Sequence, residues 1–153
     1  VRNIVQITIP NFIEHICSSS FDSCYQLELV EFANDSKLQT IGIYAFNDTA
    51  IKSIIIPSSV TFIGEFAFEF CEDLEYIEIP DDSKLQTIGI YAFNDTGIKS
   101  IIIPSSVTFI GEGAFYTCKK LNIIEIRNTE MISMYQTAFK DCQNSLLMIP
   151  FHL

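Results

Sequence analysis

A short frame of hydrophobic and polar positions recurs along the whole chain. Its first, fourth and sixth residues are apolar, and the residues between them vary, as in the heptapeptide from Ile51 to Pro57. Runs this short and this rich in β-branched residues are typical of strands, and a closing proline marks the end of a strand. Because successive strand residues point to opposite sides, the apolar positions predict a buried face and the others an exposed face. The frames begin at Ile4, Leu27, Ile51, Leu74, Ile98 and Leu121, with a partial frame near Asn144.

Each frame is followed by a second apolar pattern. It consists of an apolar residue, an isoleucine that often precedes glycine, an Ala-Phe pair, and then Cys or Thr. Equivalent residues of stacked repeats lie above one another, so the recurring phenylalanine predicts a buried ladder. Its members are Phe21, Phe46, Phe68, Phe93, Phe115 and Phe139.

Residues 35–68 return almost unchanged as residues 82–115, and only Ala50/Gly97 and Phe66/Gly113 differ. Repeats of roughly 20 to 50 residues indicate a solenoid, in which stacked units share one core. We therefore expect a single repeat domain over residues 1–153, with strands stacked in parallel about 4.8 Å apart. The chain starts and stops in strand sequence, which indicates an excerpt of a longer repeat array.

The repeat resembles the BspA-like (Treponema-type) leucine-rich repeat, whose pattern is L-x-x-I-x-I-P-x-x-V-x-x-I-G-x-x-A-F-x-x-C. Residues 51–71 and 98–118 match nearly every defined position, whereas Ser20, Arg127, Met131, Met134 and Asn144 depart from the pattern near the two ends. The resemblance implies a β-rich leucine-rich repeat solenoid of the α/β horseshoe class. In that fold a parallel sheet forms the concave face, and turns and short helical turns form the convex side. The family includes surface and secreted proteins of bacteria and trichomonads with roles in adhesion and protein binding, and it fixes no catalytic residue.

The third and fifth positions of the frame carry an unusual pattern for an exposed strand face. Apolar residues alternate there with carboxylates, which predicts an apolar patch of on the order of a few hundred Å², a size that often marks a binding site. The alternative is that copying has retained isoleucine for its strand propensity alone. The residues expected to bind a protein partner are Leu29, Glu31, Ile55, Tyr76, Glu78, Ile102, Ile123 and Glu125.

The second position of the frame alternates in charge, because Glu28 and Glu75 are followed one repeat later by Lys52 and Lys99. Opposite charges on neighbouring strands help to hold the register of a sheet. We interpret this column as structural.

Composition limits the partners. The chain has 153 residues, of which 48% are hydrophobic, and a formal net charge of −10 with only nine Lys and Arg. Nucleic acids and anionic membrane surfaces need clustered basic residues, so we expect neither as a partner. No apolar run approaches the roughly 18 residues of a spanning helix, so we expect no membrane insertion of this segment.

Cysteine and histidine suggest no chemistry. Most cysteines occupy one position of the repeat, which Thr49 and Thr96 fill in other units. Because most pairs of these cysteines are two strands apart, or about 10 Å, the spacing favours buried free thiols over disulfides. Cys17 has only His15 near it in sequence, and the Asp-Ser turns lack the further carboxylates of a calcium site, so we expect no metal. His15 and His152 stand at opposite ends, so we expect no catalytic residue and no cofactor. The shared cysteine position is that of Cys24, Cys71, Cys118 and Cys142.

Three N-x-S/T sequons make Asn34, Asn47 and Asn94 candidate N-glycosylation sites. In the second and third, the Thr occupies the buried Cys position, so core packing is an alternative reason for that Thr.

These features favour a non-catalytic protein-binding module that acts in surface adhesion or in contact with a host or neighbouring cell. Such a protein is expected at the cell surface or in secretion, and the acidic residues of the concave face predict a basic partner. The alternative is a structural scaffold or filament segment, cytoplasmic in location, that self-associates by stacking through its uncapped ends.

Overall fold

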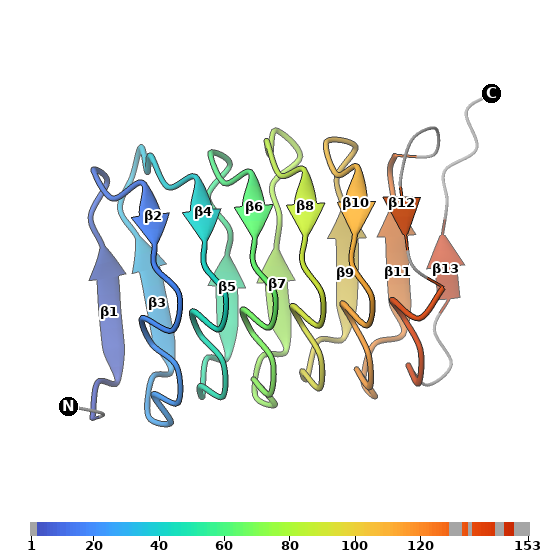
Figure 1. Ribbon diagram of the computed structural model, residues 1–153, viewed down its shortest axis with the longest axis horizontal. Coiled ribbons are helices and arrows are strands. Elements are labelled where there is room, and N and C mark those ends of the chain that lie inside the picture. Colours follow the sequence, from blue (N-terminus) through green and yellow to red (C-terminus); the bar gives the residue numbers. More distant parts are fainter. Residues whose placement is uncertain (1–2, 129–132, 135, 143–145, 149–153) are drawn as a thin grey trace.

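The computed structural model describes residues 3–128, 133–134, 136–142 and 146–148. The chain winds into a coil in which a long strand alternates with a short one, so that two rows of strands run side by side along the long axis (Figure 1). The long strands are β1 (Gln6–Ile9), β3 (Leu29–Phe32), β5 (Ser53–Ile55), β7 (Tyr76–Glu78), β9 (Ser100–Ile103), β11 (Ile123–Ile126) and β13 (Leu146–Met148). The short strands are β2 (His15–Ile16), β4 (Thr40–Ile41), β6 (Phe62–Ile63), β8 (Thr87–Ile88), β10 (Phe109–Ile110) and β12 (Ser133–Met134).

The strand pairs of the described residues are parallel and join equivalent positions of neighbouring repeats. In the row of long strands, which we call the long-strand sheet, the pairing runs β1-β3-β5-β7 and separately β13-β11-β9. The short-strand sheet has the order β12-β10-β8-β6-β4-β2. Each long strand begins two residues after the start of a frame, so the repeat pattern and the strand pattern coincide. The last frame, near Asn144, begins outside the described residues, and β13 alone represents it.

The solenoid is as the pattern predicted, but the expectation of short helical turns on the convex side is wrong. Across the described parts of the chain there is no helix, and each return segment is a two-residue strand followed by consecutive turns. These turns contain residues with positive φ, such as Tyr44 at 55° and Asp48 at 53°. A left-handed residue interrupts the run of right-handed φ values that a helical turn needs, so the segment continues as turns.

The core lies between the two sheets and consists of stacked rows of equivalent side chains. The first, fourth and sixth positions of the frame are buried, as at Ile51, Ile54 and Ile56, which are at most 2% exposed. The predicted phenylalanine ladder is present from Phe21 to Phe139, with ring centroids of neighbouring repeats 5.0 to 5.3 Å apart and nearly parallel rings. Every ring therefore lies against the next along the coil.

Glycines mark the points where successive coils touch. A Cβ atom on Gly89 would lie 2.6 Å from the carbonyl carbon of Gly64, and one on Gly64 would lie 2.7 Å from the carbonyl carbon of Gly42. Backbone atoms cannot move aside as a flexible side chain can. The recurring Ile-Gly pair therefore serves close approach between backbones.

The Cys and Thr column forms a hydrogen-bonded row inside the core. The Thr49 hydroxyl and the Cys71 thiol both donate to the carbonyl oxygen of Phe46, at 3.0 and 3.1 Å. Thr96 and Cys118 repeat this arrangement on the Phe93 carbonyl oxygen. Cys24, Cys71 and Cys118 are buried thiols, whereas Cys17 is exposed. Burial raises the pKa of the Cys71 thiol to about 11, so this thiol stays neutral where it donates its hydrogen bond inside the core.

Candidate functional site

Five large apolar side chains form a zigzag on the exposed face of the long-strand sheet, which we call the outer face. On β5 and β9 the apolar residue stands at the fifth frame position, and on β3, β7 and β11 it stands at the third. The exposed fraction is 55% for Ile55, 53% for Tyr76 and about 40% for the two isoleucines that follow. Leu29 is half-buried. We call the set of Leu29, Ile55, Tyr76, Ile102 and Ile123 the apolar zigzag.

Carboxylates fill the alternate positions of the same face. Strand pairing sets Ile55 against Glu78 and Ile102 against Glu125, and Glu31 stands at the equivalent position of β3. Glu31 accepts a hydrogen bond from the Gln6 amide at 3.1 Å. The structure therefore brings all eight predicted partner-binding residues onto one face, with apolar and acidic groups side by side.

A tyrosine hydroxyl links the two kinds of group. The hydroxyl of Tyr76 donates to the Glu78 carboxylate at 2.7 Å, and this bond raises the pKa of the tyrosine. The Tyr76 ring is thus held along its own strand, beside the carboxylate, while remaining half exposed.

The second frame position carries the ion pairs that the charge alternation predicted. Lys52 contacts Glu28 at 2.7 Å, and Lys99 contacts Glu75 at 2.6 Å. Lys120 also reaches Glu75, at 3.1 Å. These contacts raise the pKa of Lys52 and lower that of Glu75. Because the groups are solvent-exposed, they favour one register of the strands more than they stabilise the fold.

A hollow of about 550 Å³ opens on the outer face where β3 and β5 end. Its apolar lining includes Leu29, Phe32, Ile55 and Pro57, and its polar lining includes Glu31 and Asp35. The turn after β3 is one residue longer than the turn after β5, so the sequence itself places a projecting turn beside a shorter one. The hollow thus lies beside two members of the apolar zigzag, Leu29 and Ile55.

The corresponding place 47 residues further along is spanned by an arginine. Arg127, which follows β11, pairs with Glu125 at 2.8 Å and with Asp81, which follows β7. The pair passes across the end of β9, where Pro104 is buried. Glu125 raises the pKa of the guanidinium, so the group is charged at any working pH.

The three sequons occupy different environments. Asn34 is exposed in the turn after β3. The Asn47 amide is half-buried and donates to Asp22 at 2.9 Å. Asn94 is only 8% exposed, and its amide donates to Glu69 at 2.8 Å and accepts from Thr117 at 3.0 Å. Of the three candidates, Asn34 is therefore more accessible than Asn94 in the folded chain.

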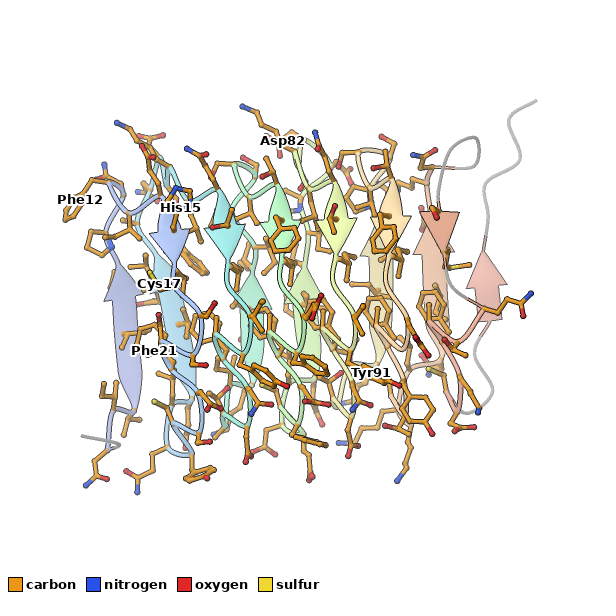
Figure 2. All side chains as sticks on the ribbon, in the orientation of Figure 1. Phe12, His15, Cys17, Phe21, Asp82 and Tyr91 are labelled. Carbon is orange, nitrogen blue, oxygen red and sulfur yellow. The ribbon has the colours of Figure 1, made fainter. Side chains whose placement is uncertain are left out.

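The remaining candidate chemistry stays dispersed. His15 contacts the Thr40 hydroxyl at 2.9 Å near the first short strand (Figure 2), and His152 lies outside the described residues. The part of the chain that the structure describes holds no cluster of three or more His, Cys, Asp or Glu arranged to bind a metal ion. It likewise holds no helix with the length and apolar character of a membrane span.

Sequence reasoning missed the hollow and the Arg127 pair. Two signals were present: the extra residue in the turn at positions 34–37, and the replacement of the usual proline by Arg127. Neither signal states which side chains meet, because Arg127 and Asp81 are 46 positions apart and come together only through the stacking of the coil.

A parallel coil with stacked Ile, Phe and Cys/Thr rows is a leucine-rich repeat solenoid. The chain belongs to the family described as the BspA type Leucine rich repeat region (6 copies), which matches residues 1–122 and 86–152. This family and fold are typical of non-catalytic binding modules. No match is found among curated proteins.

Solved structures support the same fold. The T. pallidum leucine-rich repeat protein is 23% identical, with a TM-score of 0.78 over 95% of this chain and 68% of its own. The pneumococcal vaccine antigen PcpA is 19% identical, with a TM-score of 0.59 over 94% of this chain and 51% of its own. A leucine-rich cell surface protein from Faecalibacterium prausnitzii is 25% identical, with a TM-score of 0.57 over 83% of this chain and 40% of its own. The chain thus spans about half, or less, of the length of the last two proteins.

Proposed function

We propose that this chain is a non-catalytic module that binds a protein partner through the outer face of the long-strand sheet, at a cell surface or in secretion. The observation that carries the proposal is the apolar zigzag, which exposes Ile55, Tyr76, Ile102 and Ile123 next to carboxylates. Apolar anchors ringed by charge are the usual composition of a binding patch, and the carboxylates favour a basic partner.

Two of the similar structures support the location. One is named a vaccine antigen and the other a cell surface protein. Adhesion to a host or neighbouring cell is the role that fits both this location and the exposed face.

The test replaces two equivalent zigzag residues, Ile55→Ser together with Ile102→Ser. Both side chains point away from the core, so circular dichroism and thermal unfolding should change little. Binding to a captured cell-surface protein should weaken by about 1 to 3 kcal/mol, the range of buried interface anchors. Raising the salt concentration should slow association, because it screens the carboxylates.

A matched control lies on the opposite side of the coil. Ile43 and Ile90 also occupy one position of the two copies, after β4 and β8, and Ile43 is 40% exposed. Serine at both positions should leave binding unchanged. If the two double variants bind the partner equally well, the outer face is not the binding surface. Concentration-dependent assembly in sedimentation would then favour the scaffold that stacks through its ends.

A further inference from the structure

We propose that the hollow beside β3 and β5 seats an arginine side chain of the protein partner. The aliphatic part of that arginine would lie on Leu29 and Ile55, and its guanidinium would pair with Glu31 and Asp35. The proposal rests on the function proposed above, because it specifies what the outer face takes from its partner.

The lining of the hollow has the composition that an arginine needs. An arginine buries its methylene groups on apolar surface and keeps its planar, permanently charged head for carboxylates. The lining residues Leu29, Phe32 and Ile55 supply the apolar surface. Glu31 and Asp35 supply the carboxylates. At about 550 Å³ the hollow is large enough for one long side chain and the backbone that carries it.

The negative charge around the hollow is uncompensated. None of Glu31, Asp35 and Glu78 has an ion-pair partner among the residues that the structure describes. In the neighbouring column, by contrast, Glu28 and Glu75 both contact lysines. A cation that balances the carboxylates around the hollow would therefore come from a partner.

In the second half of the chain an arginine pairs with carboxylates at the ends of long strands. Arg127 pairs there with Asp81 and Glu125 across the end of β9. The residues 47 positions before Arg127, Asp81 and Glu125 are Pro80, Asn34 and Glu78, so the first half keeps one of the two carboxylates and lacks the arginine.

Residues beside the hollow in the first half are more exposed than their counterparts in the second half. Pro57 is half-buried, whereas its counterpart Pro104 is buried. The exposed fraction is 55% for Ile55 and 41% for Ile102. The place that Arg127 closes in the second half is thus open in the first.

The experiment uses the folded chain and a capped peptide, Ac-Gly-Leu-Arg-Leu-Gly-NH2, titrated in a ¹⁵N-¹H correlation spectrum. The amides of β3, β5 and the turn at 33–36 should shift. A peptide with citrulline in place of arginine has the same shape without the charge, and it should bind roughly tenfold more weakly, since charge-assisted bonds are the stronger ones. Equal binding of the two peptides, or shifts confined to other parts of the chain, would overturn the proposal.

Two variants test the comparison of the two halves: one adds an arginine to the first half, and the other removes Arg127 from the second. Pro80→Arg places an arginine at the position 47 residues before Arg127, next to the hollow and its carboxylates, and it should abolish the shifts around β3 and β5. Arg127→Ala should open the second half, so that the arginine peptide also shifts amides of residues 79–83 and 100–105. Glu31→Gln with Asp35→Asn keeps the shape of the hollow and should weaken binding of the arginine peptide roughly tenfold. Unchanged spectra for any of these folded variants would contradict the arginine seat.

The readouts separate this proposal from the broader one. If Ile55→Ser with Ile102→Ser abolishes binding of a captured protein partner while Pro80→Arg has no effect on it, the outer face binds without an arginine in the hollow, and only this proposal fails. If the arginine peptide occupies the hollow but the double serine variant retains the protein partner, the broader proposal fails instead.

Discussion

The two copies, residues 35–68 and 82–115, differ at two positions and yet do not have the same surroundings. Their cores are equivalent, because each phenylalanine stacks on one in the repeat before and one in the repeat after. Their surfaces are not equivalent, because the strands on either side come from less similar sequence. Equivalent core residues of the two copies thus have equivalent neighbours, whereas equivalent surface residues need not.

At each glycine that distinguishes the copies, an added Cβ atom would be crowded. A Cβ atom on Gly97 would lie 2.4 Å from the carbonyl oxygen of Glu72. A Cβ atom on Gly113 would lie 2.4 Å from the ring of Tyr91, which covers it. In the first copy the aromatic position is filled, and Phe66 stacks between Tyr44 and Tyr91. The crowding at Gly97 comes from Glu72, which lies outside both copies, whereas Tyr91 has its own counterpart, Tyr44, in the first copy.

The largest expected effect tests the equivalence of the cores. Phe46 and Phe93 are both fully buried, so either substitution to alanine should destabilise the fold by about 3 to 5 kcal/mol, through lost burial and a cavity. Guanidinium unfolding of the two variants measures this. A loss below about 1 kcal/mol in either variant would reject the stacked ladder, and a difference of several kcal/mol between them would show that the copies are not equivalent inside.

A second test concerns the buried thiols and alkaline pH. The pKa of Cys71 is raised from 9.0 to about 11 because burial favours the neutral thiol. The folded chain therefore keeps a proton that the unfolded chain releases, so this stabilisation is complete below about pH 9 and is lost as the pH rises to 11. The free energy of unfolding should fall by about 2 to 3 kcal/mol over this window for a shift of this size.

The pH test also compares the equivalent cysteines that follow the two copies. Cys118, the counterpart of Cys71, has its pKa raised by its contact with Cys142 and by burial, so both thiols should resist alkylation until the chain unfolds. Urea titrations between pH 8 and 11, with mass spectrometry of alkylated cysteines, measure the effect. Rapid alkylation of Cys71 in the folded chain at pH 8 would contradict its burial.

A smaller effect is expected where the copies differ. Gly97→Ala introduces a Cβ atom against backbone and should cost about 1 to 3 kcal/mol, as overpacking does. The reverse change, Ala50→Gly, adds no atoms and should cost less than about 1 kcal/mol, mainly through chain entropy. Thermal unfolding of both variants compares them. If Gly97→Ala proves the milder change, the close approach to Glu72 is not what distinguishes the copies.

The sequence predicted the architecture and the buried rows because both depend on a period. A residue such as Phe93 meets its own counterparts at fixed spacing, so one correct alignment of the repeats places the core. The alternation of Ile55 and Ile102 with glutamates was likewise visible, because strand direction assigns the exposed side.

Two aspects of the structure did not follow from the period. The return segments lack helical turns because φ at Tyr44 and its equivalents is positive, which the side chains there do not signal. The hollow and the Arg127 bridge arise where the repeats are irregular, at a longer turn and at a missing proline. A candidate binding site that depends on departures from a repeat can be located only once the stacked neighbours are known.

Gly97 also bears on how faithfully the chain refolds. Chains that carry nearly identical neighbouring segments can exchange them between molecules, and misassembly of this kind is a characteristic failure of repeat proteins. If the first copy of one molecule stacked in place of the second copy of another, Ala50 would meet the carbonyl oxygen of Glu72, which lies outside both copies. Gly97 thus makes the exchanged arrangement less favourable than the native one.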